Sequence, residues 1–166
     1  MEAGGRGEAL IREAREGDIP LILELIRALA DYEHLLDRVE ATEEGLRRCL
    51  FQEHFAEALI AEWEGAPAGF ALFFHTFSTF VGKPGIYIED IFVKPEFRGR
   101  GLGKALFVRI GGIAAERGCG RLEWACLNWN EPAIRFYRSR GGAALDEWTT
   151  FRMSGEGLAR LGEGHG

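Results

Sequence analysis

Two adjoining segments decide the fold: Ile86-Tyr87-Ile88-Glu89-Asp90-Ile91-Phe92-Val93 and, after four intervening residues, Arg98-Gly99-Arg100-Gly101-Leu102-Gly103. The first, mostly apolar, predicts a strand, and a helix-like stretch over residues 104–117 follows the second. Glycines at this point let the backbone turn sharply and approach a ligand. The free N–H groups and positive dipole of the following helix favour negative charge. The order therefore predicts a phosphate cradle, with a pyrophosphate as the expected ligand.

The glycine spacing fits neither of two well-known nucleotide loops. A Walker loop needs four residues between its first glycine and its Gly-Lys pair and then Ser or Thr, whereas Gly99 and Gly103-Lys104 enclose three residues and Ala105 follows. A dinucleotide fingerprint opens a βαβ unit, whereas these glycines come late in the chain. Taken alone, they also fit an ordinary strand-to-helix turn without a ligand.

The remaining pattern predicts a mixed sheet with helices on its faces. Asp18 is expected to cap a first helix, and Pro20 suits its first turn. Further helices are expected over residues 43–51, 102–117 and 131–140. Strands are expected over residues 9–14, 58–63, 70–77, 86–93, 121–127 and 149–153.

Composition favours an ordinary globular domain. The 166 residues are 46 % hydrophobic and 28 % charged, which predicts a single domain over residues 1–166, with residues 1–7 expected to be disordered. A net charge of -6 argues against nucleic-acid binding and favours cationic small partners. No apolar run is long enough for a membrane span, the three cysteines form no pairing motif, and no metal-ligand spacing is present. We expect a cytoplasmic protein without a metal.

Four blocks carry a resemblance to a known family: Ile88-Glu89-Asp90, the Arg98–Gly103 loop, Trp129-Asn130-Glu131-Pro132 and Phe136-Tyr137. In order and spacing the chain resembles the Gcn5-related N-acetyltransferases (GNAT), most of all the branch of spermidine/spermine and thialysine N-acetyltransferases. The resemblance implies the α/β (α+β) GNAT fold, with a mixed, mostly antiparallel central sheet flanked by helices on both faces. It also implies acetyl-CoA as co-substrate.

The resemblance assigns most of the cofactor site to the strand and the glycine loop. Backbone N–H groups of the loop would hold the pyrophosphate, Arg98 would be a further phosphate or ribose partner, and residues 91–93 would pair with the pantetheine arm like an added strand. Asn130 would hold pantetheine or cap a helix. The full set of expected cofactor contacts is Ile91, Phe92, Val93, Arg98, Gly99, Arg100, Gly101, Leu102, Gly103, Lys104, Asn130, Ala133 and Tyr137.

The chemistry requires a base and an acid. An alkylammonium is protonated at neutral pH and must lose a proton before it attacks a thioester. Glu89 is the expected base, directly or through a water, because it interrupts an apolar strand beside the cofactor and partial burial there would make it a better proton acceptor. Tyr137 is the expected donor to the departing thiolate. Because Cys126 has no paired histidine, direct transfer is favoured over a thiol intermediate.

The acceptor is expected to be a small cationic amine: a diamine, a polyamine or a lysine-like amino acid such as thialysine. The substrate contacts implied by the resemblance are Tyr32, Glu33, Glu89, Asp90 and Glu147. The branch also implies a homodimer. Two alternatives stay open from the sequence, a protein or peptide N-acetyltransferase and a non-catalytic acyl-CoA-binding sensor.

Overall fold

The protein is described here by a computed structural model covering residues 7–164, which fall into two compact units divided between Ala125 and Cys126. The disorder expected for residues 1–7 lies, apart from Gly7, outside the described residues. In the described part of the chain, no helix is both long and apolar enough to cross a bilayer. His, Cys, Asp and Glu side chains of residues 7–164 form no group of three or more that suits a metal ion.

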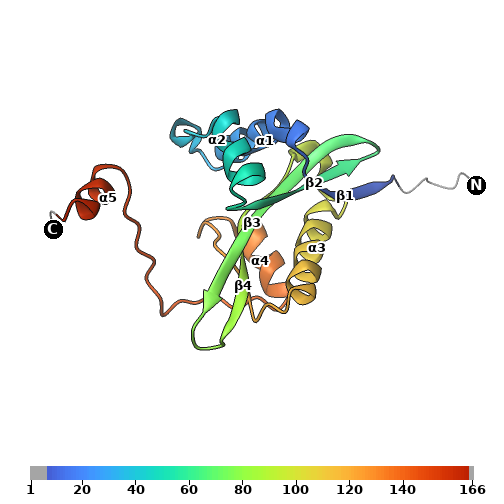
Figure 1. The fold of residues 1–166 in the computed structure, drawn as a ribbon. Coiled ribbons are helices and arrows are strands. Elements are labelled where there is room, and N and C mark those ends of the chain that lie inside the picture. The colour runs from blue at the N-terminus through green and yellow to red at the C-terminus, as the bar shows by residue number, and fades with distance from the viewer. Residues whose placement is uncertain (1–6, 165–166) are drawn as a thin grey trace, which may run out of the picture. The chain divides into compact units, whose positions relative to one another are not determined.

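The first unit is built on one five-stranded sheet in which sequence order and spatial order agree (Figure 1). Neighbouring strands pair antiparallel except for the last pair, β4 and β5, which is parallel. The sheet is therefore mixed and mostly antiparallel, as the sequence predicts. Its strands are β1 (Ala9–Glu13), β2 (Glu57–Trp63), β3 (Ala66–Ser78), β4 (Lys83–Val93) and β5 (Leu122–Trp124).

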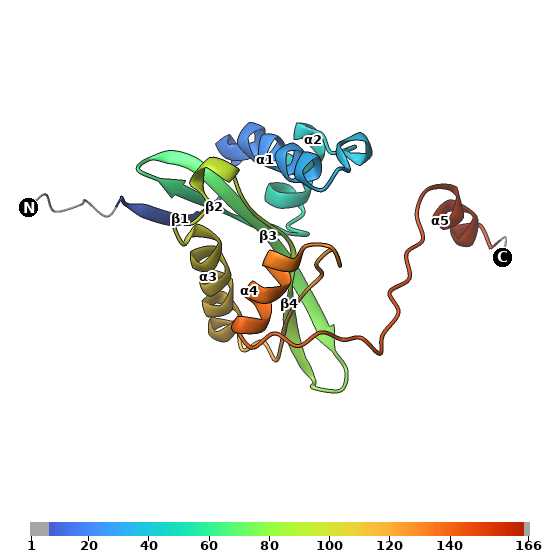
Figure 2. The ribbon, with the colours of Figure 1, turned by 180° about the vertical axis from the view of Figure 1, so that it is seen from behind.

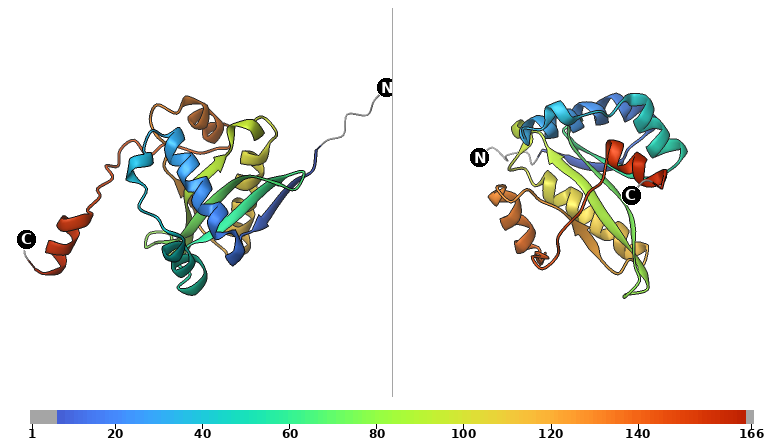
Figure 3. Two further views of the ribbon diagram at one scale, coloured as in Figure 1. Left: turned by 90° about the horizontal axis from the view of Figure 1, so that it is seen from above. Right: turned by 90° about the vertical axis from the view of Figure 1, so that its left-hand side faces the viewer.

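A two-residue turn joins β2 to β3. Glu64 and Gly65 both have positive φ, 51° and 80°, which is the pattern of a type I′ hairpin turn. The sequence predicted the hairpin but placed the second strand four residues later, at Phe70. The tight turn lets β3 begin at Ala66 instead, so β3 and β4 form the long central hairpin of the sheet (Figure 3).

Helices cover both faces of this sheet (Figures 1 and 2). One face packs against α1 (Ile19–Tyr32) and the region of α2 (Glu43–Arg47), around a core that includes Ile22, Phe70 and Phe92. The other face packs against α3 (Leu102–Glu116), whose Leu106 and Ile110 are fully buried. Short helical turns lie at Glu16–Asp18, Leu36–Arg38, Arg48–Gln52 and Pro95–Phe97.

An ion network fixes the start of α1 to the sheet. Asp18 stands at the N-cap position, but its carboxylate makes no capping bond to the helix and instead accepts hydrogen bonds from Arg12 at 2.7 and 2.9 Å. Arg12 also donates to Glu62 at 2.7 Å. The Arg12 guanidinium holds the pKa of Asp18 below its usual range. The predicted helix start is confirmed, but the expected side-chain cap is wrong, because the Asp18 carboxylate bonds to Arg12 of β1 and to the N–H of Arg15 instead of to the helix backbone.

A β-bulge interrupts β4 at Glu89. Leu72 of β3 lies opposite Asp90 while Phe73 lies opposite Ile88, so Glu89 has no opposite residue. The extra residue shifts the alternation of side chains by one step. Before the bulge, Ile88 packs in the core on the α3 side; after it, Phe92 packs in the core on the α1 side.

The second unit contains two helices, α4 (Glu131–Ser139) and α5 (Gly155–Gly162). The predicted strand over residues 149–153 is wrong for this structure, because in the described chain these residues form no strand. The strand predicted over residues 121–127 is shortened to β5. Residues 149–153 belong to none of the five strands that the structure describes. Phe151 within this segment is 89 % exposed.

Candidate functional site

The glycine loop between β4 and α3 has the backbone shape of an anion cradle. Gly99 and Gly101 have φ of 77° and 82°, a region that residues with a side chain rarely adopt. Gly101 is the N-cap of α3 and, being glycine, places no capping side chain over the first N–H groups of the helix. A Cβ added at Gly101 would meet no protein atom within 4 Å, so the surface of the loop is open at this point.

The basic side chains of the loop point in different directions. Arg100 folds back, with its guanidinium carbon 5.0 Å from the Trp63 ring centroid and 5.5 Å from that of Phe97. Lys104, in the first turn of α3, is exposed, and no ion pair among residues 7–164 involves it. The cradle therefore offers mainly backbone N–H groups and the helix dipole, with Lys104 as a nearby cation.

The edge of β4 beside the loop is left partly unpaired. β5 pairs with β4 only from Ile86 to Ile88, whereas β4 continues to Val93. On that edge, no strand of the described residues pairs with residues 89–93. An extended ligand can add to such an edge through backbone hydrogen bonds.

Three carboxylates come together where the end of α1 meets the bulge, and we call Glu33, Glu89 and Asp90 the acidic cluster. Burial raises the pKa of Asp90 to about 7, with further contributions from the negative charges of Glu89 and Glu33. Burial also raises the pKa of Glu33. Among residues 7–164, no ion pair involves the acidic cluster. This concentration of negative charge suits a cationic ligand.

The burial expected at Glu89 is found one residue later. Glu89 is exposed, whereas Asp90 is half-buried. The bulge explains the difference, because it adds Glu89 as an extra residue and returns Asp90 to the face of the sheet that carries Phe92 and α1. The expectation that Glu89 is the partly buried carboxylate is therefore wrong, and Asp90 has the environment of a weak acid that titrates near neutral pH.

The Arg98 side chain contacts the end of α1. Its guanidinium carbon is 4.5 Å from the ring centroid of Tyr32 and 5.8 Å from that of Phe92. Its Nε donates a hydrogen bond to the carbonyl oxygen of Val93 at 3.1 Å. The side chain thus lies on the α1 face, beside the residue that precedes Glu33, and not over the glycine loop.

The remaining predicted residues belong to the second unit. Asn130 is the N-cap of α4, and its Oδ1 accepts a hydrogen bond from the N–H of Ala133 at 3.4 Å. Tyr137 lies on α4, and burial, with a further contribution from Cys126, raises its pKa to about 12. Glu147 is exposed in a turn. Tyr137 therefore keeps its hydroxyl proton throughout the neutral range.

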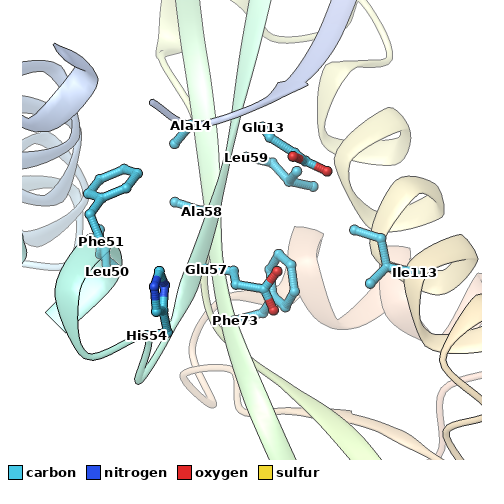
Figure 4. Close-up of a pocket in the computed structure, with 10 residues that line it drawn as sticks. All are labelled: Glu13, Ala14, Leu50, Phe51, His54, Glu57, Ala58, Leu59, Phe73 and Ile113. Atoms are coloured by element: carbon cyan, nitrogen blue, oxygen red, sulfur yellow. The ribbon is translucent and has the colours of Figure 1, made fainter. Parts of the chain in front are cut away.

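A cavity of about 210 Å³ in the first unit contains none of the predicted site residues (Figure 4). Phe51 and His54 approach it from the α2 side and Ile113 from α3, with Glu57 between them. Arg117 binds the Glu57 carboxylate through two hydrogen bonds, 2.6 and 2.8 Å long. Arg117 therefore already neutralises the Glu57 carboxylate of this cavity.

Comparison with known proteins identifies the family. The sequence profile described as "Acetyltransferase (GNAT) family" matches residues 22–141. The chain belongs to the GNAT family. It is 42 % identical to the thialysine N-epsilon-acetyltransferase of Bos taurus, over 92 % of this chain and 96 % of the relative. It is 30 % identical to the L-ornithine N5-acetyltransferase NATA1 of Arabidopsis thaliana, over 95 % and 90 % of the two chains.

A solved structure has the same fold. The integron cassette protein VCH_CASS6 from the mobile metagenome of V. cholerae matches with a TM-score of 0.78 at 26 % identity, covering 93 % of this chain and 98 % of its own. The protein is therefore an acetyltransferase that uses acetyl-CoA as co-substrate and acts on amines. The open glycine loop at the start of α3 fits the negatively charged pyrophosphate of this co-substrate.

The GNAT resemblance did not reveal the bulge, although the sequence carries a signal for it. Core positions on the α3 side run Ile86, Ile88 and then Ile91, Val93, so one step is three residues instead of two. A break of this kind in the period of a strand indicates an inserted residue. The stacking of Arg98 on Tyr32 has no such signal, because it joins residues far apart in the chain.

Proposed function

We propose that this GNAT enzyme transfers the acetyl group of acetyl-CoA directly to a primary amine of a small cationic acceptor, namely a diamine, a polyamine or a lysine-like amino acid such as thialysine. The observation that carries the proposal is the acidic cluster, which presents three carboxylates without a cationic partner among the described residues. An amine with a second positive charge would neutralise this cluster. The names of the thialysine and ornithine enzymes among its relatives agree with an acceptor of this kind.

The backbone of the glycine loop would hold the pyrophosphate of acetyl-CoA, with Gly99, Gly101 and Gly103 keeping the surface open. A Cβ at Gly103 would stand 3.8 Å from Val93, an ordinary contact, so no packing within the protein demands glycine there. Close approach of a ligand gives that position a reason to lack a side chain. The unpaired edge at residues 91–93 supports the proposal that the pantetheine arm adds to β4.

We propose the Glu89–Asp90 pair as the proton acceptor for the attacking amine. The sequence favours Glu89, directly or through a water, and the half-buried setting of Asp90 makes it the better-placed member of the pair at neutral pH. The other carboxylates would bind the acceptor: Glu33 beside Tyr32 in the first unit and Glu147 in the second.

Tyr137 is the proposed donor to the departing thiolate. Its pKa of about 12 lies above that of a thiol, near 8.5, so complete proton transfer to sulfur is uphill. A hydrogen bond from the phenol as the carbon–sulfur bond breaks is the better description. The N-cap bond of Asn130 fixes the start of the helix that carries Tyr137.

We further propose that the two units act as one acetyltransferase domain in a cytoplasmic homodimer. The family match runs across the division between Ala125 and Cys126, which supports a single domain. Trp148, Phe151 and Met153 are exposed within one short segment. Exposed apolar side chains that lie close together favour burial against another protein surface, which supports the proposed dimer. No disulfide joins the described cysteines, which agrees with a reducing compartment.

The test is release of free thiol from acetyl-CoA by the purified protein. The acceptor panel contains thialysine, lysine, ornithine, short diamines, spermidine, a neutral monoamine and a lysine-containing peptide. Tyr137→Phe is the matched variant, because it keeps the ring and removes only the hydroxyl. We expect the highest kcat/KM with a small acceptor that carries a second positive charge, and a large fall in kcat in the variant.

Equal rates with neutral and dicationic acceptors would contradict the role of the acidic cluster. A peptide preferred over every small amine would move the assignment to protein acetylation. A light-scattering mass near 18.5 kDa for the intact protein would contradict the homodimer.

A further inference from the structure

Arg98 connects two parts of the first unit that the sequence assigns to different substrates. Its Nε bonds to the carbonyl of Val93, the last residue of the β4 edge proposed for pantetheine. Its guanidinium lies over the ring of Tyr32 at the end of α1. Tyr32 in turn lies against Phe92, with ring centroids 6.5 Å apart. One side chain thus spans from the cofactor strand to the last helical turn before Glu33.

The end of α1 near the acidic cluster is closed by local backbone hydrogen bonds, from the N–H of Glu33 to the carbonyl of Leu29 at 3.0 Å and from the N–H of Leu35 to that of Ala30 at 2.7 Å. Glu33 follows the last residue of the helix, and His34 after it has a positive φ of 59°. A second contact between α1 and the region after β4 is the ion pair of Lys94 with Glu24, 2.9 Å long. Glu24 lies nine residues before Glu33, about 13 Å further along the helix axis. Of these two contacts between α1 and the residues at and after the end of β4, that of Arg98 lies nearer to Glu33.

We propose that Arg98 is a positioning residue for the amine acceptor, which clamps Tyr32, and through it Glu33, onto the strand that binds acetyl-CoA. This inference rests on the proposed function. It differs from the role that the motif position suggests, a phosphate or ribose contact, because the guanidinium is used by the Tyr32 and Phe92 rings and its Nε by Val93. The planar fork of arginine suits stacking on a ring, which the point charge of lysine does less well.

The two roles predict opposite kinetic effects. If Arg98 binds phosphate, its removal raises the KM for acetyl-CoA and leaves the KM for the amine unchanged. A clamp on Tyr32, once removed, raises the KM for the amine by about three- to tenfold, as expected for the loss of a cation–π contact, and changes the KM for acetyl-CoA less than about twofold.

The experiment measures both KM values and kcat for the wild type, Arg98→Ala, Arg98→Lys, Tyr32→Leu and the double variant Arg98→Ala/Tyr32→Leu. Lys94→Met is the matched control, because it removes a different contact between α1 and the residues after β4, the ion pair with Glu24. We expect Arg98→Ala and Tyr32→Leu each to raise the amine KM. The double variant should be no worse than the more affected single variant, since both changes remove the same contact. Arg98→Lys should recover only part of the loss.

A raised acetyl-CoA KM with an unchanged amine KM in Arg98→Ala would overturn the inference and restore the phosphate role. Full rescue by lysine, additive effects in the double variant, or an equal loss in Lys94→Met would overturn it too. If Arg98→Ala does not fold, the comparison of Tyr32→Leu with Arg98→Lys decides in the same way. Absence of turnover by the wild type with every amine would refute the proposed function and this inference with it. If the wild type does turn over an amine, the proposed function stands, and the variants test the role of Arg98 alone.

Discussion

Replacing Asp90 by Asn should make the protein more stable at alkaline pH. The pKa of Asp90 is raised from 3.8 to about 7, so the folded protein holds a proton there that the unfolded chain has released. Between these two pH values the folded state binds more protons, and stability falls as pH rises. Below pH 4 the carboxyl is protonated in both states, and the difference disappears.

The magnitude follows from the size of the pKa change. A rise of about three pH units at about 1.36 kcal/mol per unit gives roughly 4 kcal/mol of destabilisation above pH 7. Solvent at the partly exposed carboxyl reduces this figure, so we expect a gain of about 2 to 4 kcal/mol for Asp90→Asn at pH 8. For a chain of this length, such a gain corresponds to about 5 to 15 °C in Tm.

The assay is urea and thermal unfolding of the wild type and Asp90→Asn from pH 4 to pH 9. The two stability curves should coincide near pH 4, diverge between pH 4 and 7, and run parallel above pH 8. Glu89→Gln is the control, because it removes one neighbouring charge from an exposed position and should give a smaller gain. An Asp90→Asn protein that is no more stable than the wild type at pH 8 would refute the burial and crowding of this carboxylate.

Three further predictions concern the same unit. A dicationic amine that binds the acidic cluster should raise the Tm. It should also release protons at pH 7, because its positive charge lowers the pKa of Asp90. Calorimetry in buffers of different ionisation enthalpy measures this release, and proton uptake would contradict the prediction. Gly101→Ala should lower the free energy of unfolding by about 1 to 2 kcal/mol, because φ is 82° there, and should weaken CoA binding. The control Gly111→Ala, inside α3 with open space around it, should raise the free energy of unfolding by about 0.5 to 1 kcal/mol. Similar unfolding curves for both variants would be inconsistent with a left-handed residue in the loop. Arg12→Met should lower the free energy of unfolding by about 1 to 3 kcal/mol at pH 7, since it leaves the Asp18 carboxylate without its cationic partner. This loss should shrink as pH falls through the range where Asp18 protonates. A loss independent of pH would show that the variant removes packing and not a charge interaction.

Local chemistry made much of this fold predictable. The glycine loop, the strand before it and the helix after it depend on turn residues and on the period of apolar side chains, both of which are written in neighbouring positions. The hairpin was predicted, but its turn was expected to be longer than the two residues observed. A two-residue turn needs positive φ at both Glu64 and Gly65, and glycine at position 65 does not by itself require positive φ at Glu64.

Features that depend on distant partners were not predictable in this way. Arg98 follows the motif that normally marks a phosphate contact, and only the position of α1 shows that Tyr32 is its neighbour. The segment over residues 149–153 has the sequence pattern of a strand but forms none in the described chain. Local sequence indicates which secondary structure a segment favours, whereas contacts with distant segments decide which one it adopts.

The bulge at Glu89 separates the part of β4 that we propose to bind the acceptor from the parts that pack in the two hydrophobic cores. Glu89 and Asp90 belong to neither hydrophobic core, although Ile88 before them and Phe92 after them are each buried in one. If these two residues bind the acceptor as proposed, substitutions there can change which amines bind while both cores keep their packing. The same property makes positions 89 and 90 the natural pair to randomise when a GNAT scaffold of this kind is engineered toward a different amine.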